Sequence, residues 1–198
     1  MDGFIESILI SEEEIDSIPS SLAEKITEDY KNSDKTLVLL CLLKGSIIFM
    51  GDLMKKLPLP LEIEAMKVSS YGSSSVSSGK INIQLDLNRK DLSNVDILIV
   101  EDIIDSGNTL SRICKHLKER GAASVRTCTM LDKPARREVD FVPDYCGKTI
   151  PDKFVVGYGL DYDEKFRNLP YIGILKPEVY GGTSADNPQS QTEVQYAL

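Results

Sequence analysis

Apolar residues along the chain fall into two kinds of pattern, short continuous runs and longer stripes at helical spacing. The runs at 36–43 and 95–100 are almost wholly apolar, as expected for strands buried on both faces of a parallel sheet. Further strands are predicted at 62–69, 81–85 and 125–131. Because helical stripes lie between several of these runs, we expect an α/β fold with a mostly parallel central sheet flanked by helices.

The helical stripes predict three main helices. Ser11 begins a capping-box pattern, and the apolar residues of 15–30 form the stripe of a first helix, which Pro19 should kink or split. A second helix should end at Leu57, before two prolines. A third stripe at 110–117 follows the second apolar run, so strand and helix form half of a parallel α/β unit.

The segment between the second apolar run and the third helix carries the densest chemistry. Glu101, Asp102 and Asp105 are expected just past the strand, where open α/β sheets bind their ligands. The helix then opens with four small or polar residues, Ser106, Gly107, Asn108 and Thr109. Backbone N–H groups at a helix N-terminus suit a phosphate. The neighbouring acids can hold sugar hydroxyls, a developing cation or, through water, a metal.

Taken alone, this segment leaves other interpretations open. A plain helix start, with Ser106 or Asn108 as the N-cap, would need no ligand. A P-loop is disfavoured because the pattern G-x-x-x-x-G-K-[ST] is absent. An acidic pocket like that of response regulators would explain the acids, but not the anion site beside them.

Composition and charge limit the class of protein. With 198 residues, of which 41% are hydrophobic, the chain should form one globular domain. A formal charge of −8 without a basic patch disfavours nucleic acid as a partner. The acidic N-terminal stretch is unlike a signal peptide, and no apolar run is long enough to span a membrane. Four cysteines without C-x-x-C spacing favour a reducing compartment, and we expect the cytoplasm.

An apolar strand, Glu101-Asp102, two aliphatic residues and the segment 105–109 together resemble a known ligand loop. It is the loop that binds 5-phosphoribosyl-1-pyrophosphate (PRPP) in type I phosphoribosyltransferases. The segment 151–162 (PDKFVVGYGLDY) narrows the resemblance to the hypoxanthine-guanine branch and extends it over roughly residues 5–180. It implies that family's fold in one domain at 1–180, with a small hood built from the N-terminal segment and about 150–180. The polar residues 181–198 are predicted to be a disordered tail.

The resemblance implies an enzyme of purine salvage. Its reaction would be the Mg²⁺-dependent transfer of a 5-phosphoribosyl group from PRPP to hypoxanthine or guanine, giving IMP or GMP and pyrophosphate. The implied partners are PRPP and a 6-oxopurine base, without nucleic acid or membrane, in a homo-oligomer that is a dimer or a tetramer. Two other functions stay open. One is a PRPP-sensing regulator that binds nucleic acid, and the other is a transferase that prefers xanthine or adenine.

The resemblance also implies roles for the residues around the central loop. Asp105 would be the general acid or base at the purine N7, while Glu101 and Asp102 would bind ribose hydroxyls. PRPP would also contact Lys44, Gly45, Arg167 and the helix-opening residues Ser106, Gly107, Asn108 and Thr109. Some members of the family have a basic residue where this chain has Asn108, so weaker PRPP binding is expected. In the family, the bond that matches Lys44-Gly45 is a non-proline cis peptide.

Base, metal and lid residues follow from the same comparison. The purine would contact Ile103, Lys133, Phe154 and Val155, with Lys133 at its 6-oxygen and Phe154 stacked on its ring. Without the resemblance, Lys133 would be a solvated charge and Phe154 a core residue. Magnesium would be held by Asp161 with help from Glu101 and Asp102. Ser70 and Tyr71 would begin a mobile lid at 70–79. Arg136 and Arg137 are expected to be surface charges without a role.

Overall fold

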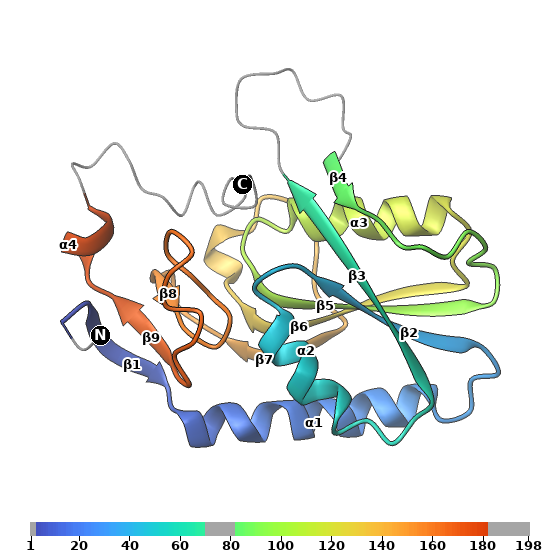
Figure 1. Cartoon of the computed structure of the whole chain (residues 1–198), viewed down its shortest axis with the longest axis horizontal. Helices are drawn as coiled ribbons and strands as arrows, with labels where there is room; N and C mark the ends of the chain where they lie inside the picture. Colours follow the sequence, from blue (N-terminus) through green and yellow to red (C-terminus); the bar gives the residue numbers. More distant parts are fainter. Residues whose placement is uncertain (1–2, 70–81, 182–198) are drawn as a thin grey trace.

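The computed structural model describes residues 3–69 and 82–181 and is built around one large sheet (Figure 1). The sheet has six strands in the order β4-β3-β2-β5-β6-β7. Their bounds are β2 Thr36–Leu42, β3 Leu61–Ser69, β4 Asn82–Leu85, β5 Val95–Ile104, β6 Ser124–Asp132 and β7 Tyr145–Thr149. All neighbours pair in parallel except β4, which runs antiparallel to β3. The predicted mostly parallel central sheet is therefore confirmed.

Helices cover both faces of this sheet. The core on one face includes α1 (Glu12–Tyr30) and α2 (Ile47–Met54), and the core on the other face includes α3 (Asn108–Glu119). Successive residues of β2 alternate between them, so that Leu39 belongs to the first core and Leu40 to the second. Burial on both faces explains why this strand reads as one continuous apolar run.

A second, smaller sheet forms what we call the hood, which consists of β1, β8, β9 and α4. Its strands β1 (Ile5–Ile10), β9 (Ile172–Leu175) and β8 (Val155–Val156) pair antiparallel in the order β1-β9-β8, and α4 (Pro177–Tyr180) follows. In Figure 1 the hood lies at the left, beside the main sheet. The chain thus brings its N-terminal strand together with segments that follow the main sheet in sequence.

Three predicted boundaries differ from the structure. The helix α1 runs without a break through Pro19, so the predicted split is wrong; Pro19 is buried with the apolar stripe, whose packing compensates for the missing N–H. The helix α2 ends at Met54 rather than Leu57. Strand β5 continues to Ile104 because its backbone keeps pairing with β6, so Glu101 and Asp102 lie inside the strand rather than past it.

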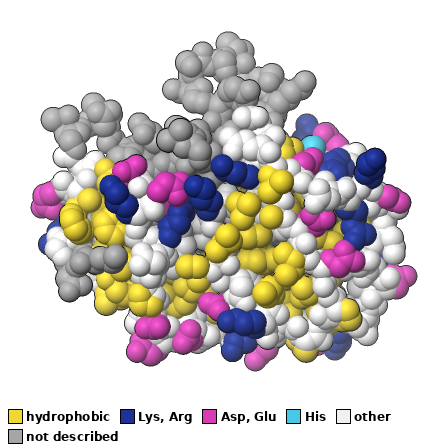
Figure 2. Space-filling view, in the orientation of Figure 1, with side chains coloured by type: hydrophobic (Ala, Val, Ile, Leu, Met, Phe, Trp, Pro, Cys, Tyr) yellow, Lys and Arg dark blue, Asp and Glu magenta, His cyan; other side chains and the backbone are white. Residues whose placement is uncertain are grey.

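Some expectations fall on parts that the structure does not describe. The lid residues Ser70 and Tyr71 lie outside the described residues, as does the predicted tail from residue 182 onward. Within 3–69 and 82–181, none of the helices combines the length and the apolar character that a membrane crossing requires. On the face shown in Figure 2, positive and negative side chains are interspersed around hydrophobic ones.

Candidate active site

Two adjacent acids at the end of β5 are buried in the main sheet. Burial raises the pKa of Glu101 well above its usual range, and the neighbouring Asp102 raises it further. Burial also raises the pKa of Asp102 to about 6, although the Ile103 N–H, 2.8 Å from Asp102 Oδ1, opposes this shift. Glu101 Oε2 has no hydrogen-bond partner among the described residues. Buried acids with shifted pKa values, placed at the carboxyl ends of parallel strands, mark this region as a functional site.

Two glycines bring distant segments against Asp102. A Cβ atom on Gly45 would lie 1.6 Å from Asp102 Oδ2, so the loop after β2 can approach this carboxyl only with glycine. A Cβ atom on Gly159, whose φ is +101°, would lie 1.9 Å from the Gly45 carbonyl oxygen. The loops after β2 and β8 and the end of β5 therefore meet at one place. The cis peptide bond here joins Leu43 to Lys44, so the expected Lys44-Gly45 position is corrected by one residue.

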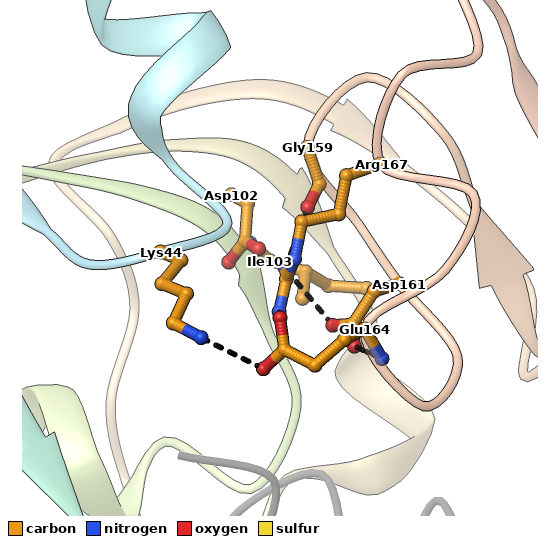
Figure 3. A network of polar contacts seen from close by, with 7 residues as sticks. All are labelled: Lys44, Asp102, Ile103, Gly159, Asp161, Glu164 and Arg167. Carbon is orange, nitrogen blue, oxygen red and sulfur yellow. Dashed lines mark hydrogen bonds and ion pairs between the residues drawn. The ribbon is translucent and has the colours of Figure 1, made fainter. Parts of the chain in front are cut away.

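Charged side chains join the loop after β2 to the loop after β8 (Figure 3). Lys44 Nζ lies 3.0 Å from Glu164 Oε1, and Arg167 Nη2 lies 3.3 Å from Glu164 Oε2. Arg167 Nη1 also lies 2.9 Å from Asp161 Oδ1 and donates to the Gly159 carbonyl at 2.8 Å. Hydrogen bonding by Lys44 lowers the pKa of Glu164, whereas burial raises the pKa of Asp161. Lys44, Asp161 and Arg167 were all predicted site residues, but Glu164 was not.

The start of α3 is open rather than capped by a side chain. Its N-cap is Gly107, in the left-handed region at φ +81°, and no side chain caps the helix. The first turn also contains no acidic residue, and Thr109 belongs to that turn. The alternative with Ser106 or Asn108 as the N-cap is therefore wrong, although the Asn108 N–H does donate to Ser106 Oγ at 3.2 Å. An uncapped N-terminus with left-handed glycine suits an anion.

The predicted catalytic acid and the predicted base-binding lysine form a pair. Lys133 follows β6 and is only 1% exposed, with its Nζ 3.3 Å from Asp105 Oδ1. The interpretation of Lys133 as a solvated charge is therefore wrong. A buried ammonium group requires a nearby opposite charge, and Asp105 supplies it.

Arg137 holds the same loop from the other side, which the sequence did not suggest. Its guanidinium donates to the Asp105 carbonyl and to the Asp132 carboxylate, and its side chain is largely buried. The prediction of a surface charge is therefore wrong for Arg137, whereas Arg136 pairs with Asp152 nearer the surface. The two arginines are adjacent in sequence: Arg136 is the last residue of the short 3-10 helix η1 (Pro134–Arg136), and Arg137 follows it.

Arg137→Lys is expected to lower the melting temperature by about 3–10 °C, because one ammonium cannot replace a fork that bridges two partners. Calorimetry measures this loss, and kcat/KM should fall with it because the Asp105 loop loses its support. Arg136→Lys is the matched control and should change both values little. Equal effects of the two substitutions would contradict a special role for Arg137.

The hood contributes the aromatic part of the site. Phe154 is 5% exposed; Tyr180 stacks on it with ring centroids 4.9 Å apart, and Tyr162 meets it edge-on at 5.6 Å. Phe154 thus packs in the hood core, as the interpretation without the resemblance expected, and Tyr180 covers one face of its ring. Val155 is paired with Ile174 in the hood sheet. Ile103 lies near the end of β5, directly after Asp102.

The acids of the site are the candidate protein ligands for a magnesium ion. In the described part of the chain, no three His, Cys, Asp or Glu side chains gather as a metal cage. Both Asp161 oxygens already have partners, Arg167 and the Glu164 N–H. The Asp161 charge also raises the pKa of Asp102, and a divalent cation would relieve this repulsion. The residues therefore fit a magnesium ion that takes most of its ligands from phosphate oxygens and water.

Comparisons with known proteins agree with this geometry. Residues 7–163 match the family model described as phosphoribosyl transferase domain. The chain is 49% identical over 176 residues to a hypoxanthine-guanine phosphoribosyltransferase of Staphylococcus epidermidis, covering 89% of this chain and 97% of that one. It is 48% identical over 180 residues, 91% of this chain, to the bifunctional protein TilS/HprT of Listeria monocytogenes, of whose length it spans 27%.

A solved structure gives the same result. The crystal structure of a hypoxanthine phosphoribosyltransferase from Staphylococcus aureus matches with a TM-score of 0.85 at 47% identity, over 91% of this chain and 97% of the other. The family match covers most of the chain, and several relatives are almost half identical along nearly their whole length. The chain therefore belongs to the phosphoribosyltransferase family, in its hypoxanthine-guanine branch.

Proposed function

We propose that this protein transfers a 5-phosphoribosyl group from PRPP to hypoxanthine or guanine, with magnesium, giving IMP or GMP and pyrophosphate in purine salvage. The observation that carries the proposal is the ion pair of buried Lys133 with partly exposed Asp105, beside the uncapped start of α3. A group that can move a proton on a purine and a group that can bind a purine oxygen stand next to a phosphate site. The names of the staphylococcal relatives support the same assignment.

The 5′-phosphate of PRPP is assigned to the loop that opens α3. The hydroxyls of Ser106 and Thr109 and the backbone N–H groups from Gly107 onward would bind its oxygens. Asn108 brings no positive charge, and its side-chain amide is engaged by Glu138 at 2.6 Å. Binding of this phosphate would therefore rely on the two hydroxyls, the backbone N–H groups and the helix dipole, without a positively charged side chain from Asn108.

The ribose is assigned to Glu101 and Asp102. Because burial raises the pKa of both carboxyls, a protonated oxygen can donate to one ribose hydroxyl while an ionised one accepts from another. When the bond from C1 to the pyrophosphate oxygen breaks, the ribose gains positive character. A fixed carboxylate beside the ribose stabilises that charge better than it stabilises the neutral ground state.

The leaving pyrophosphate is assigned to Lys44, the backbone at Gly45 and Arg167. Lys44 and Arg167 stand on either side of Glu164, and Arg167 also pairs with Asp161 (Figure 3). Asp161 would hold magnesium on the pyrophosphate, with Glu101 and Asp102 nearby. A bound magnesium ion would supply positive charge against the departing oxygens.

The purine is assigned to the space between β5 and the hood. Phe154 would stack on it with the ring face opposite Tyr180, Ile103 would contact its other side, and the backbone at Val155 would read its edge. As purine N9 bonds to ribose C1, Asp105 takes the proton from N7. Lys133 donates to the 6-oxygen and at the same time balances the charge of Asp105.

We further infer how the chain is organised. Residues 1–180 would act as one domain, since Lys44 of the main sheet and Glu164 near the hood share one site. We also infer that the protein forms a homo-oligomer, either a dimer or a tetramer. A cytoplasmic location is inferred because the four free cysteines among the described residues fit a reducing compartment. A PRPP-sensing regulator is the second candidate, but the interspersed charges in Figure 2 favour no nucleic-acid surface on that face.

Purified protein is expected to release pyrophosphate from PRPP with hypoxanthine or guanine when magnesium is present. The assay compares four purines (hypoxanthine, guanine, xanthine and adenine), each with and without a chelator that removes the metal. Chelation should abolish release, because the pyrophosphate charge then lacks its counter-ion. Protein that binds PRPP but releases no pyrophosphate with any purine would favour the regulator. Release with xanthine or adenine alone would overturn the base assignment.

A further inference from the structure

Glu164 lies between the two cations of the leaving-group site without belonging to any role assigned so far. We propose that its carboxylate is an exchangeable internal anion, which pairs with Lys44 and Arg167 until pyrophosphate displaces it and which returns when pyrophosphate leaves. This inference rests on the proposed function, because it takes Lys44 and Arg167 as the pyrophosphate ligands.

The contacts place Glu164 where a ligand anion would have to bind. Its two oxygens are used separately, with Oε1 3.0 Å from Lys44 Nζ and Oε2 3.3 Å from Arg167 Nη2. Lys44 comes from the loop after β2 and Arg167 from the loop after β8, and the Glu164 carboxylate bridges them (Figure 3). Two oxygens of a pyrophosphate could make the same two contacts only if the carboxylate moved away.

Glu164 is able to move, whereas the neighbouring acid is not. The side chains of Glu164 and Lys44 are 50% and 42% exposed, so water can replace their contact at little cost in free energy. The carboxylate of Asp161 is only 11% exposed and is held by Arg167 and by the Glu164 N–H. Asp161 therefore stays in place as the proposed metal ligand while the Glu164 carboxylate exchanges.

The backbone of this loop also allows the Glu164 carboxylate to move while Asp161 stays fixed. Glu164 has a φ of +61°, in the left-handed region, and its N–H donates to Asp161 Oδ2 at 2.8 Å. That hydrogen bond fixes the turn independently of where the Glu164 side chain points. A swing of the carboxylate therefore needs rotation about side-chain bonds alone, without rearrangement of the loop.

Exchange between the Glu164 carboxylate and pyrophosphate would affect both substrate binding and product release. A carboxylate that competes for the two cations weakens the binding of PRPP and pyrophosphate, and it helps pyrophosphate to leave by refilling the site behind it. Removing the charge should therefore tighten pyrophosphate binding and strengthen product inhibition. The nucleotide product, which lacks the pyrophosphate, should bind as before.

The test compares Glu164→Gln with Asp163→Asn in the full chain. Glutamine keeps the size and one acceptor but loses the charge, and Asp163 is a matched control because its carboxylate pairs with Lys165 at the surface. Titration calorimetry with magnesium pyrophosphate should give a dissociation constant about 3- to 10-fold lower for Glu164→Gln than for wild type, with Asp163→Asn unchanged. The inhibition constant of pyrophosphate should fall equally, and the dissociation constant of GMP should stay the same.

Each outcome decides the inference separately from the proposed function. Unchanged or weaker pyrophosphate binding by folded Glu164→Gln would overturn it, and the carboxylate would then be a structural brace. Equal tightening by Asp163→Asn would also overturn it, because the effect would then come from net charge. Wild-type protein that binds neither PRPP nor pyrophosphate would instead sink the proposed function, whatever the variants do.

Discussion

Asp105→Asn is expected to lower kcat by about 10²–10⁴-fold while PRPP binding is largely retained, because asparagine keeps the shape of the side chain but cannot take a proton. Asp105 follows directly on β5, and its carbonyl accepts a hydrogen bond from Arg137. Since that contact uses the backbone, the substitution leaves the loop supported. Single-turnover kinetics with PRPP and guanine measures the chemical step, and calorimetry measures PRPP affinity.

The pairing of Asp105 with Lys133 requires a further control in this experiment. Asparagine leaves a 1% exposed ammonium group without its opposite charge, so the variant should also lose stability. Activity must therefore be expressed per folded protein, with the melting temperature measured alongside. Asp152→Asn removes the acid that pairs with Arg136 near the surface and should leave kcat nearly unchanged. An Asp105→Asn variant that turns over within a few-fold of wild type would show that another group carries the proton.

The main sheet was predictable from the sequence because a strand that is buried on both faces appears as a continuous run of apolar residues. Leu39 and Leu40 point into different cores, so no polar residue interrupts their strand. The end of β5 was less predictable, because Glu101 and Asp102 look like loop residues. They remain in the strand since β6 supplies backbone partners, and the sequence of β5 contains no information about its neighbour.

Candidate site residues were predictable only where they belong to a recognisable sequence motif. In the segment from Asp105 to Thr109, a glycine and hydroxyls next to acids predicted an anion site, and the structure places an uncapped helix N-terminus with left-handed Gly107 there. Arg137 and Glu164 had no such signal, because each acts through partners that are distant along the chain or bound through backbone atoms. The burial of Lys133 likewise depends on how β6 ends beside β5, which periodicity cannot show.

The largest specificity effect is expected at Lys133, through discrimination of 6-oxopurines from adenine. Hypoxanthine and guanine present an acceptor at O6 and a donor at N1, whereas adenine presents a donor amine and a bare N1. The Lys133 ammonium only donates, and a carbonyl near Val155 only accepts. Each mismatch leaves a buried polar group unpaired at roughly 1–3 kcal/mol, so wild type should reject adenine by about two to four decades in kcat/KM.

Lys133→Met tests this expectation, because methionine fills the space of a buried lysine stem without its charge. The variant should lose activity with guanine and hypoxanthine and narrow their advantage over adenine. Part of the loss comes from Asp105, which lies 3.3 Å from the ammonium and loses its partner, but that part affects every base equally. The ratio of kcat/KM values between bases therefore isolates recognition from proton transfer.

Phe154→Leu is the matched control, because stacking depends on a π-face that every purine offers. It should weaken guanine, hypoxanthine and adenine alike and leave their ratios unchanged. Since Tyr180 already covers one face of Phe154, the loss measures stacking on the remaining face. If Lys133→Met left the ratio between hypoxanthine and adenine as in wild type, base choice would have to reside in the Val155 backbone, and Lys133 would serve only as the counter-charge of Asp105.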